Sequence, residues 1–185
     1  MKFIAIFLSL IILLSQSVAA KEATLDEMIG QMIMIGFHGD CCNCKSFKRI
    51  QALAKNGEIG GVIFFKHNVK NKCEFEKMTK TLKNTKTSLP LLLAVDQEGG
   101  YVQRLSADNG FENFPSFKQV AKKMTPEEAQ FMYEKMAQML ENANLNMNFS
   151  PCVDLDINQE SIIAKKERSF SSKPEIVEKY AKAVI

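Results

Sequence analysis

The side chains with the clearest chemical potential lie in one short stretch of this 185-residue chain, Leu92–Arg104. An apolar run leads into Asp96, Gln97 and Glu98, then two glycines, and Arg104 follows four residues later. A carboxylate accepts hydrogen bonds from hydroxyl groups and a guanidinium donates in a fixed fork, so the two together suit a polyhydroxylated ligand. The glycines permit close approach of backbone or ligand. An Asp–Arg pair that only ties the loop down remains the alternative.

Polar side chains follow the other apolar runs as well. In a parallel sheet the carboxyl ends of the strands meet at one edge, where α/β proteins place their functional residues. The further candidates at this edge are His38, Asp40, Lys66, His67, Asn68, Asn148, Ser150, Asp154, Asp156, Glu167 and Arg168.

Four apolar segments predict the strands that position these residues, over 32–37, 59–65, 89–95 and 146–155. Their nearly continuous apolar character predicts burial on both faces, and hence a parallel sheet covered by helices. Helices are predicted from a capping box at Thr24 and over 46–55, 74–86, 117–123, 126–142 and from 174 onward. Alternating strands and helices indicate an α/β fold, either an open doubly wound sheet or a (β/α)₈ barrel. No G-x-G-x-x-G follows a strand, so a dinucleotide site is unsupported.

The overall composition is that of an ordinary globular protein. Hydrophobic residues make up 46%, charged residues 24% and aromatic residues 9%. These values exclude a disordered, collagen-like or disulfide-dense class. The formal charge of +3 is too small to indicate a nucleic-acid partner.

The first twenty residues predict a secretory signal peptide. Lys2 precedes the apolar run Phe3–Leu14, and small residues end at Ala20, where cleavage is expected. The run is too short to span a bilayer comfortably, although an uncleaved anchor is the alternative. We therefore expect a domain over 21–185, exported to the periplasm or secreted, with no stable membrane insertion after cleavage.

Five cysteines are an odd number for an exported protein, so at least one stays unpaired or bonds another chain. They are Cys41, Cys42, Cys44, Cys73 and Cys152. The first three lie near His38, but no second matching pair completes a metal-binding pattern, so no metal site is expected. Loop thiols, with one disulfide that is local or linked to Cys73, are the expectation.

Several motifs in order resemble the N-terminal domain of glycoside hydrolase family 3, and the β-N-acetylhexosaminidase branch most closely. The resemblance covers essentially all of 21–185. Its motifs are Gly30–Phe37, Ile59–Phe65 with Asn68, Leu91–Arg104 with its DQEGG, Asn144–Asp154 as an N-x-N-x-x-P-x-x-D stretch, and Glu167–Ser171 as a D-R-S-F-G-like loop.

The resemblance implies the N-terminal portion of a (β/α)₈ barrel, about four βα units. It implies a retaining enzyme that releases terminal non-reducing N-acetylhexosamine from cell-wall-type glycans, without metal or organic cofactor. Asp96, Arg104 and Arg168 correspond to sugar-binding positions. Glu98 is expected to organise the loop, and Asp154 to order the loop that carries Arg168.

The sequence departs from the family pattern at Tyr101, where Arg is common, and at Glu167 and Ser171, where Asp and Gly are common. The family's Asp nucleophile and its His acid/base with an orienting Asp would follow the Arg168 loop and helix. We therefore assign no catalytic residue, expect a partial barrel with little turnover, and interpret His38 and His67 as loop residues. The alternatives are a family 3 β-glucosidase and a non-catalytic sugar-binding remnant. The aglycone and the oligomeric state stay open.

Overall fold

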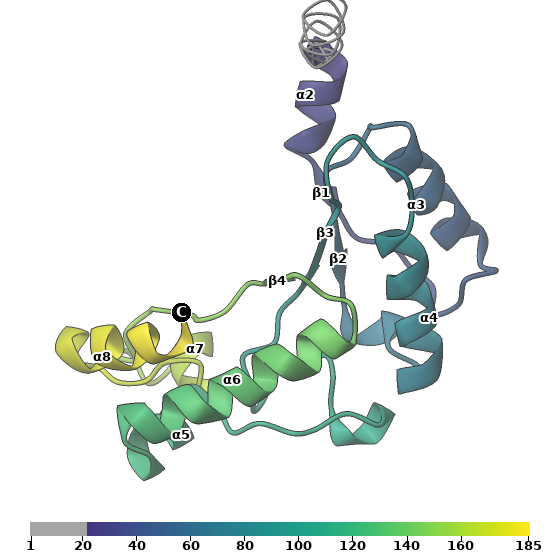
Figure 1. Ribbon diagram of the computed structural model, residues 1–185. Helices are drawn as coiled ribbons and strands as arrows, with labels where there is room; N and C mark the ends of the chain where they lie inside the picture. Colours follow the sequence, from purple (N-terminus) through teal and green to yellow (C-terminus); the bar gives the residue numbers. More distant parts are fainter. Residues whose placement is uncertain (1–21) are drawn as a thin grey trace, which may run out of the picture.

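The computed structural model describes residues 22–185, so the predicted signal peptide lies outside the described residues. Its centre is a four-stranded parallel sheet in the order β1-β2-β3-β4 (Figure 1). The strands are β1 (Met34–Ile35), β2 (Gly61–Phe64), β3 (Leu92–Val95) and β4 (Met147–Asn148). A doubly wound sheet reverses its strand order at a switch point, whereas a barrel adds strands in sequence. The observed order is sequential and has no switch point within residues 22–185.

Helices alternate with the strands, as expected for an α/β fold. They are α2 (Leu25–Gln31), α3 (Lys45–Lys55), α4 (Lys72–Lys83), α5 (Phe117–Lys123), α6 (Pro126–Asn142), α7 (Ile162–Lys165) and α8 (Pro174–Val184), with 3₁₀ turns η1 (Lys66–Asn68) and η2 (Ala107–Asn109). Figure 1 shows α3 and α4 on one side of the sheet. It shows α5, α6 and α8 as a separate group, at the end of the sheet opposite to α2. None of the helices over 22–185 is long and apolar enough to span a membrane.

Capping residues set the helix starts where the sequence predicts them. Thr24 and Glu27 form a reciprocal capping box at α2, and Thr125 with Glu128 forms another at α6. Pro126 occupies the first turn of α6, where its missing N–H removes no hydrogen bond. These local interactions explain why both starts are readable from the sequence.

Alternate side chains of the central strands form the core with α3 and α4. Val62, Phe64, Leu93 and Val95 are fully buried. They belong to one cluster with Phe47, Phe75, Met78 and Leu82 from the two helices. Burying each such side chain contributes about 1.5–3 kcal/mol, so this face of the sheet carries much of the stability of the fold.

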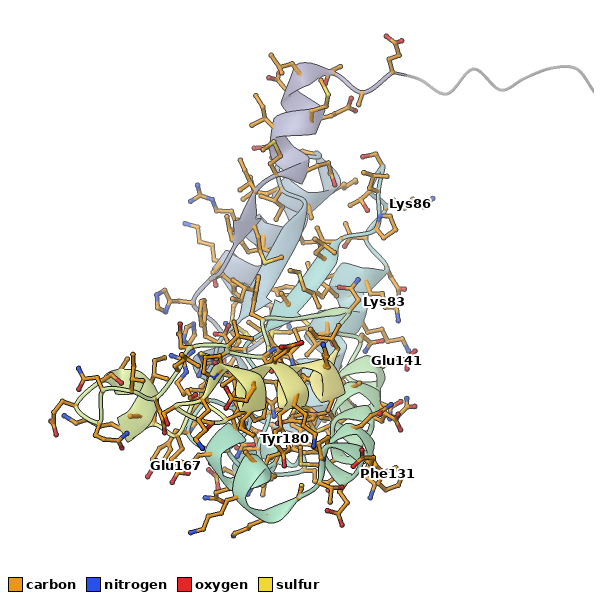
Figure 2. The ribbon with its side chains drawn as sticks, turned by 90° about the vertical axis from the view of Figure 1, so that its left-hand side faces the viewer. Lys83, Lys86, Phe131, Glu141, Glu167 and Tyr180 are labelled. Carbon is orange, nitrogen blue, oxygen red and sulfur yellow. A yellow bond between two sulfur atoms is a disulfide. The ribbon has the colours of Figure 1, made fainter. Side chains whose placement is uncertain are left out.

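A second packing layer joins the later helices. Tyr180 of α8, labelled in Figure 2, donates a hydrogen bond from its hydroxyl to the carbonyl of Met124 at 2.6 Å, and its ring stacks on Phe170. Phe170 in turn lies against Phe117 of α5, with ring centroids 4.5 Å apart. The α8 helix is thereby fixed against the α5–α6 pair.

Four features of the structure differ in detail from the sequence predictions. The first strand is shorter than 32–37, because Met32 is 88% exposed and only two residues pair. Burial on both faces does not hold throughout, since Leu92 is 42% exposed. The fourth strand comprises only Met147–Asn148 rather than 146–155, and α7 forms in a stretch for which no helix was predicted.

Candidate active site

Asp96 and Arg104 meet where β3 ends. Arg104 Nη2 donates to Asp96 Oδ2 at 2.7 Å, and the side chains of Arg104 and Asp96 are 23% and 25% exposed. Asp96 Oδ1 has no hydrogen-bond partner over residues 22–185, and Arg104 Nε is buried without one. A buried donor without a partner is costly. Asp96 Oδ1 and Arg104 Nη1 are therefore the atoms available to a polar ligand, since Nη1 also has no hydrogen-bond partner over residues 22–185 and Nε is closed off from solvent.

Gln97 holds Arg104 in place from within the core. Its side chain is fully buried, and its Oε1 accepts from the backbone N–H groups of Arg104 at 2.9 Å and Leu105 at 3.1 Å. Its Nε2 donates to the Leu105 carbonyl at 2.8 Å. Gln97 thereby holds the backbone of Arg104 and Leu105 against the end of β3, which places Arg104 opposite Asp96. The sequence alone predicts for Gln97 only its place at the strand end.

Two asparagines join the fourth strand to the third. Asn146 accepts from the Leu93 N–H at 2.7 Å and donates to the Leu91 carbonyl at 3.0 Å. Asn148 makes the same pair of bonds with the N–H and carbonyl of Gln97, at 2.9 and 3.0 Å. A side-chain amide has the donor and acceptor of a peptide group. These side chains thus replace part of the backbone ladder, which explains why β4 is so short.

Glu98 and Arg168 form the second ion pair of the site. Arg168 Nη2 lies 2.6 Å from Glu98 Oε1, and its Nε lies 2.9 Å from Oε2. Glu98 is only 3% exposed, and the Arg168 side chain is 29% exposed. Hydrogen bonding to Glu98 raises the pKa of Arg168 above its ordinary value, against the opposing effect of burial. Glu98 is therefore a loop-organising acid whose carboxylate is fully occupied.

The glycine turn after Glu98 needs the absence of side chains. Gly99 and Gly100 have positive φ values of 97° and 57°, and a Cβ on Gly99 would lie 2.2 Å from the Pro115 carbonyl oxygen. The Gly100 N–H donates to the carbonyl of Phe114 at 2.8 Å. The turn is thereby pressed against the segment that begins α5.

Glu167 connects this segment to the Arg168 loop. Ser116 Oγ donates to Glu167 Oε2 at 2.6 Å, and Gln119 Nε2 donates to the same oxygen at 3.2 Å. The Ser116 hydrogen bond, aided by Gln119 and nearby lysines, lowers the pKa of Glu167 below its ordinary value. The residue that departs from the family pattern thus has a defined structural role here.

The family model for the glycosyl hydrolase family 3 N-terminal domain matches residues 24–185. The chain belongs to glycoside hydrolase family 3. The match covers every element that contributes to the two ion pairs, from the strands to the Arg168 loop.

Relatives and solved structures of family 3 share this region. The chain is 29% identical to Beta-hexosaminidase A of Pseudoalteromonas piscicida over 90% of its own length and 31% of the relative's. A β-N-acetylglucosaminidase of the family from Paenibacillus sp. FPU-7 superposes with a TM-score of 0.78 at 27% identity, covering 89% of this chain and 30% of that one. NagZ from Neisseria gonorrhoeae gives 0.68 at 27% identity, covering 82% and 44%. The chain thus spans about a third to under half of these proteins.

The three predicted sugar-binding residues occupy the same edge of the family 3 domain, on two connected ion pairs. The predicted role of Asp154 takes a different form, because its side chain contacts Cys152 rather than Arg168. Its backbone carbonyl accepts from Ser169 Oγ at 2.6 Å, which orders the residue after Arg168. Tyr101 is 63% exposed, and the ammonium of Lys166 lies 4.8 Å from its ring centroid.

The site is an open edge rather than an enclosed cavity. A cavity of about 560 Å³ lies between α6 and β4, and another of about 480 Å³ lies beside Phe131 and Met124. Neither includes Asp96, Arg104 or Arg168. The ion pairs, with their partly exposed side chains, are the better candidate for sugar recognition because they offer directed donors and acceptors.

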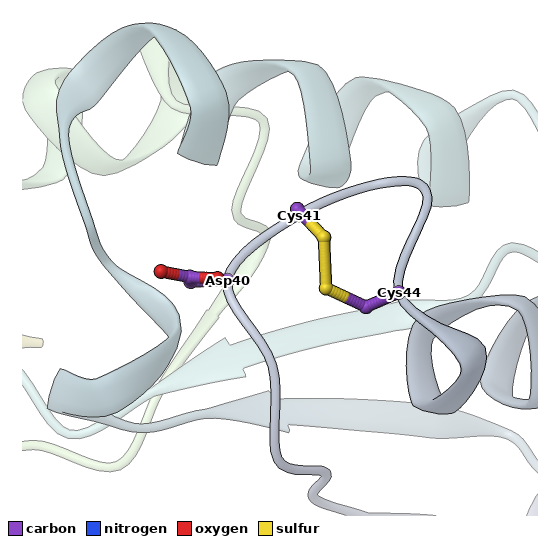
Figure 3. A group of neighbouring side chains, drawn as sticks. All are labelled: Asp40, Cys41 and Cys44. Carbon is purple, nitrogen blue, oxygen red and sulfur yellow. A yellow bond between two sulfur atoms is a disulfide. The ribbon is translucent and has the colours of Figure 1, made fainter.

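The histidines and the cysteine-rich turn lie beside the neighbouring strands. His38 and His67 stack with ring centroids 4.7 Å apart, and both belong to loop or 3₁₀ segments, as expected. Cys41 and Cys44 form a disulfide, which confirms the expected local bridge (Figure 3). Asp40 lies near the two sulfur atoms, but bonding between them removes both as metal ligands.

Proposed function

We propose that this chain forms the sugar-holding part of a retaining β-N-acetylhexosaminidase that acts on cell-wall-type glycans. The Asp96–Arg104 pair carries the proposal, because Asp96 Oδ1 and Arg104 Nη1 have no hydrogen-bond partner within 22–185 and lie at the end of a central strand. The family match and relatives named as β-hexosaminidases support the choice of sugar class.

Each proposed contact follows from an atom that the ion pairs leave available. Asp96 Oδ1 accepts from hydroxyl groups of the terminal sugar, and Arg104 donates. Arg168 uses Nε and Nη2 on Glu98, so its Nη1 is left to contact the ligand. Glu98 keeps Arg168 in place and makes no contact of its own.

Asp96 and Glu98, the carboxylates of the two ion pairs, are positioned for binding rather than for bond cleavage. Retaining hydrolysis uses a nucleophile and an acid/base about 5 Å apart. Both oxygens of Glu98 accept from Arg168, and Asp96 is engaged by Arg104. We therefore expect the 185-residue chain to bind N-acetylglucosamine without appreciable turnover. In the family, the reacting groups follow the loop that corresponds to the Arg168 loop.

Ligand titration of the full chain tests this proposal. N-acetylglucosamine is expected to shift NMR signals near Asp96, and glucose much less. Asp96→Asn should weaken binding about tenfold, corresponding to loss of one charge-assisted hydrogen bond. Glu141→Gln, on the exposed surface of α6, is the matched control and should leave affinity unchanged.

Two aryl glycosides separate the enzyme classes in the same preparation. Clear hydrolysis of the N-acetyl-β-glucosaminide would contradict a binding role alone. Preferential binding or hydrolysis of the plain β-glucoside would favour the family 3 β-glucosidase alternative. Absence of binding to either sugar would contradict the proposed subsite.

The proposed location is outside the cytoplasm, in the periplasm or the medium. The basic start, apolar run and small residues before Ala20 support it. Amino-terminal sequencing of the protein recovered from the cell envelope and medium is expected to begin at Lys21. A membrane-bound product beginning at Met1 would support the uncleaved anchor instead.

A further inference from the structure

Three aromatic rings stack on one another at the carboxyl ends of β1 and β2. Phe65 follows β2 directly, and His67 of η1 stacks on it with ring centroids 5.7 Å apart and planes inclined by 23°. His38, which follows β1, stacks on His67 at 4.7 Å with planes inclined by 20°. Phe65 is half-buried, whereas both imidazoles are exposed. These three side chains form the ring stack, whose exposed end consists of the two imidazoles.

Hydrogen bonds and close packing hold the ring stack in place. His67 Nε2 lies 2.9 Å from the carbonyl oxygen of Phe37, and the buried Asn68 donates from Nδ2 to the same oxygen at 2.9 Å. Gly36 leaves room for the Phe65 ring, because a Cβ on Gly36 would lie only 2.6 Å from Phe65 Cε2. The rings are therefore ordered before any ligand arrives, which lowers the entropic cost of binding.

The strand register places the ring stack beside Asp96. Phe64 of β2 pairs with Val95 of β3. The next residues, Phe65 and Asp96, are therefore neighbours where the two strands end, about 4.8 Å apart across the sheet. The two paired residues are buried in the core, and side chains alternate between the faces of a sheet, so Phe65 and Asp96 share the opposite face. The ring stack thus begins one strand away from Asp96 and continues toward β1.

The exposed end of the ring stack offers an aromatic surface to a sugar. The face of an aromatic ring carries partial negative charge, and the C–H groups on one side of a pyranose ring carry partial positive charge. Apolar contact adds to this attraction, because both surfaces leave water. Among residues 22–185, His38 stacks on no ring other than His67, so one of its faces has no aromatic partner. A pyranose ring therefore has a surface to pack on at His38.

We propose that the ring stack is a second sugar subsite, which binds the sugar unit joined to the N-acetylhexosamine that Asp96 holds. This proposal rests on the function proposed above, because Asp96 and Arg104 bind the first unit. His38 follows β1, two strands from Asp96 and thus about 10 Å across the sheet, a separation that a disaccharide spans. His38 contacts the second unit, whereas His67 and Phe65 position the His38 ring. The ligand is therefore an oligosaccharide with at least two units.

Titration of the full chain with two ligands tests the proposal. N-acetylglucosamine occupies only the first subsite, whereas its β-1,4-linked disaccharide reaches both. The disaccharide should bind about fivefold more tightly, which is the gain expected from one aromatic contact. The chain contains two histidines, so their imidazole C–H signals in proton NMR report on the ring stack directly. The signal of His38 should shift with the disaccharide and stay in place with the monosaccharide.

Variants of the rings separate sugar contact from a purely structural role. His38→Ala should lower disaccharide affinity to that of the monosaccharide and leave monosaccharide affinity unchanged, while circular dichroism shows a folded chain. His38→Phe keeps an aromatic face and should retain most of the gain. His67→Ala removes the support of the His38 ring and should lose part of the gain. Lys70→Ala, exposed shortly after η1, is the matched control and should leave both affinities unchanged.

The outcomes distinguish the second subsite from the function on which it rests. Equal affinity for the two sugars, or an equal loss for both in His38→Ala, would overturn the second subsite and leave the binding role of Asp96 intact. Disaccharide binding that is lost in His38→Ala but persists in Asp96→Asn would support the ring stack and contradict the first subsite. Absence of binding to either sugar would overturn both.

Discussion

In each ion pair of this protein, part of the arginine side chain is free to contact a ligand. Arg168 binds Glu98 through two nitrogens, and Arg104 binds Asp96 through one. Each pair thus fixes the position of a guanidinium and leaves its other nitrogens without a side-chain partner. A planar group with several donors can bind a carboxylate on one side and a ligand on another, and an ammonium group does not provide this geometry. The identity of Arg at both positions is therefore a geometric requirement as well as a charge requirement.

Replacing Arg104 by Lys should separate charge from geometry. The ammonium retains the positive charge but cannot occupy the Nη2 and Nη1 positions together, so we expect N-acetylglucosamine affinity to fall about tenfold. Isothermal titration measures the change. Lys135→Arg, on α6, is the control and should not alter binding. Affinity equal to that of the wild type would show that only the charge of Arg104 matters.

The pKa of Glu167 predicts a pH dependence of stability. Ser116 and Gln119 lower this pKa in the folded state. The ionised carboxylate therefore stabilises the fold at pH values above 4.5, which is the pKa of the group in the unfolded chain. That contribution disappears as the pH falls below 4.5 through the lower folded-state pKa. The difference in melting temperature between wild type and Glu167→Gln should therefore be present at pH 6 and shrink toward pH 3. Glu160→Gln should show no such trend, and a difference that grows on acidification would contradict the assignment.

At the scale of elements, buried amide side chains connect the ends of the strands. Asn68 ties the end of β2 to the segment after β1, Asn148 ties β4 to Gln97, and Gln97 ties the returning loop to β3. Each amide supplies both a donor and an acceptor without net charge, so it satisfies backbone groups that a short strand leaves unpaired. The edge at which we propose sugar binding is therefore held together by amides, and the charged groups lie beside them.

Gln97→Leu should test this dependence on buried amides. The substitution leaves the N–H groups of Arg104 and Leu105 and the Leu105 carbonyl without their partner, so we expect a loss of about 3 kcal/mol in unfolding free energy. Urea denaturation measures it. Gln138→Leu, exposed on α6, should change stability by less than about 0.5 kcal/mol. A small effect at Gln97 would mean that other contacts hold the loop.

Over residues 22–185, two packing layers meet in one continuous apolar core. One layer covers the sheet with α3 and α4, and the other contains α5, α6 and α8 (Figure 1). The Glu98–Arg168 pair joins the segment after β3 to the Arg168 loop, so the site depends on both layers being in place. Loosening the second layer should therefore weaken sugar binding even though its residues touch no ligand.

Tyr180→Phe tests the coupling between the layers. It removes the hydroxyl bonded to the Met124 carbonyl and keeps the ring stack on Phe170, so the expected loss is about 1 kcal/mol of unfolding free energy. Thermal melting followed by circular dichroism measures it, with a small reduction in N-acetylglucosamine affinity expected. Phe131→Leu, on the exposed side of α6, is the control. A loss above about 3 kcal/mol would indicate that the ring has also moved.

The sequence by itself determined the α/β class, the starts of α2 and α6, and the residues at the end of β3. These features depend on neighbours within a few positions, through capping bonds, apolar runs and glycine turns. Only the tertiary structure decided that Arg168 binds Glu98, 70 residues away, that Asn146 and Asn148 replace strand pairing, and that α7 is helical. Such contacts form when separate strands end at one edge, and their partners are chosen by packing in three dimensions rather than by spacing along the chain.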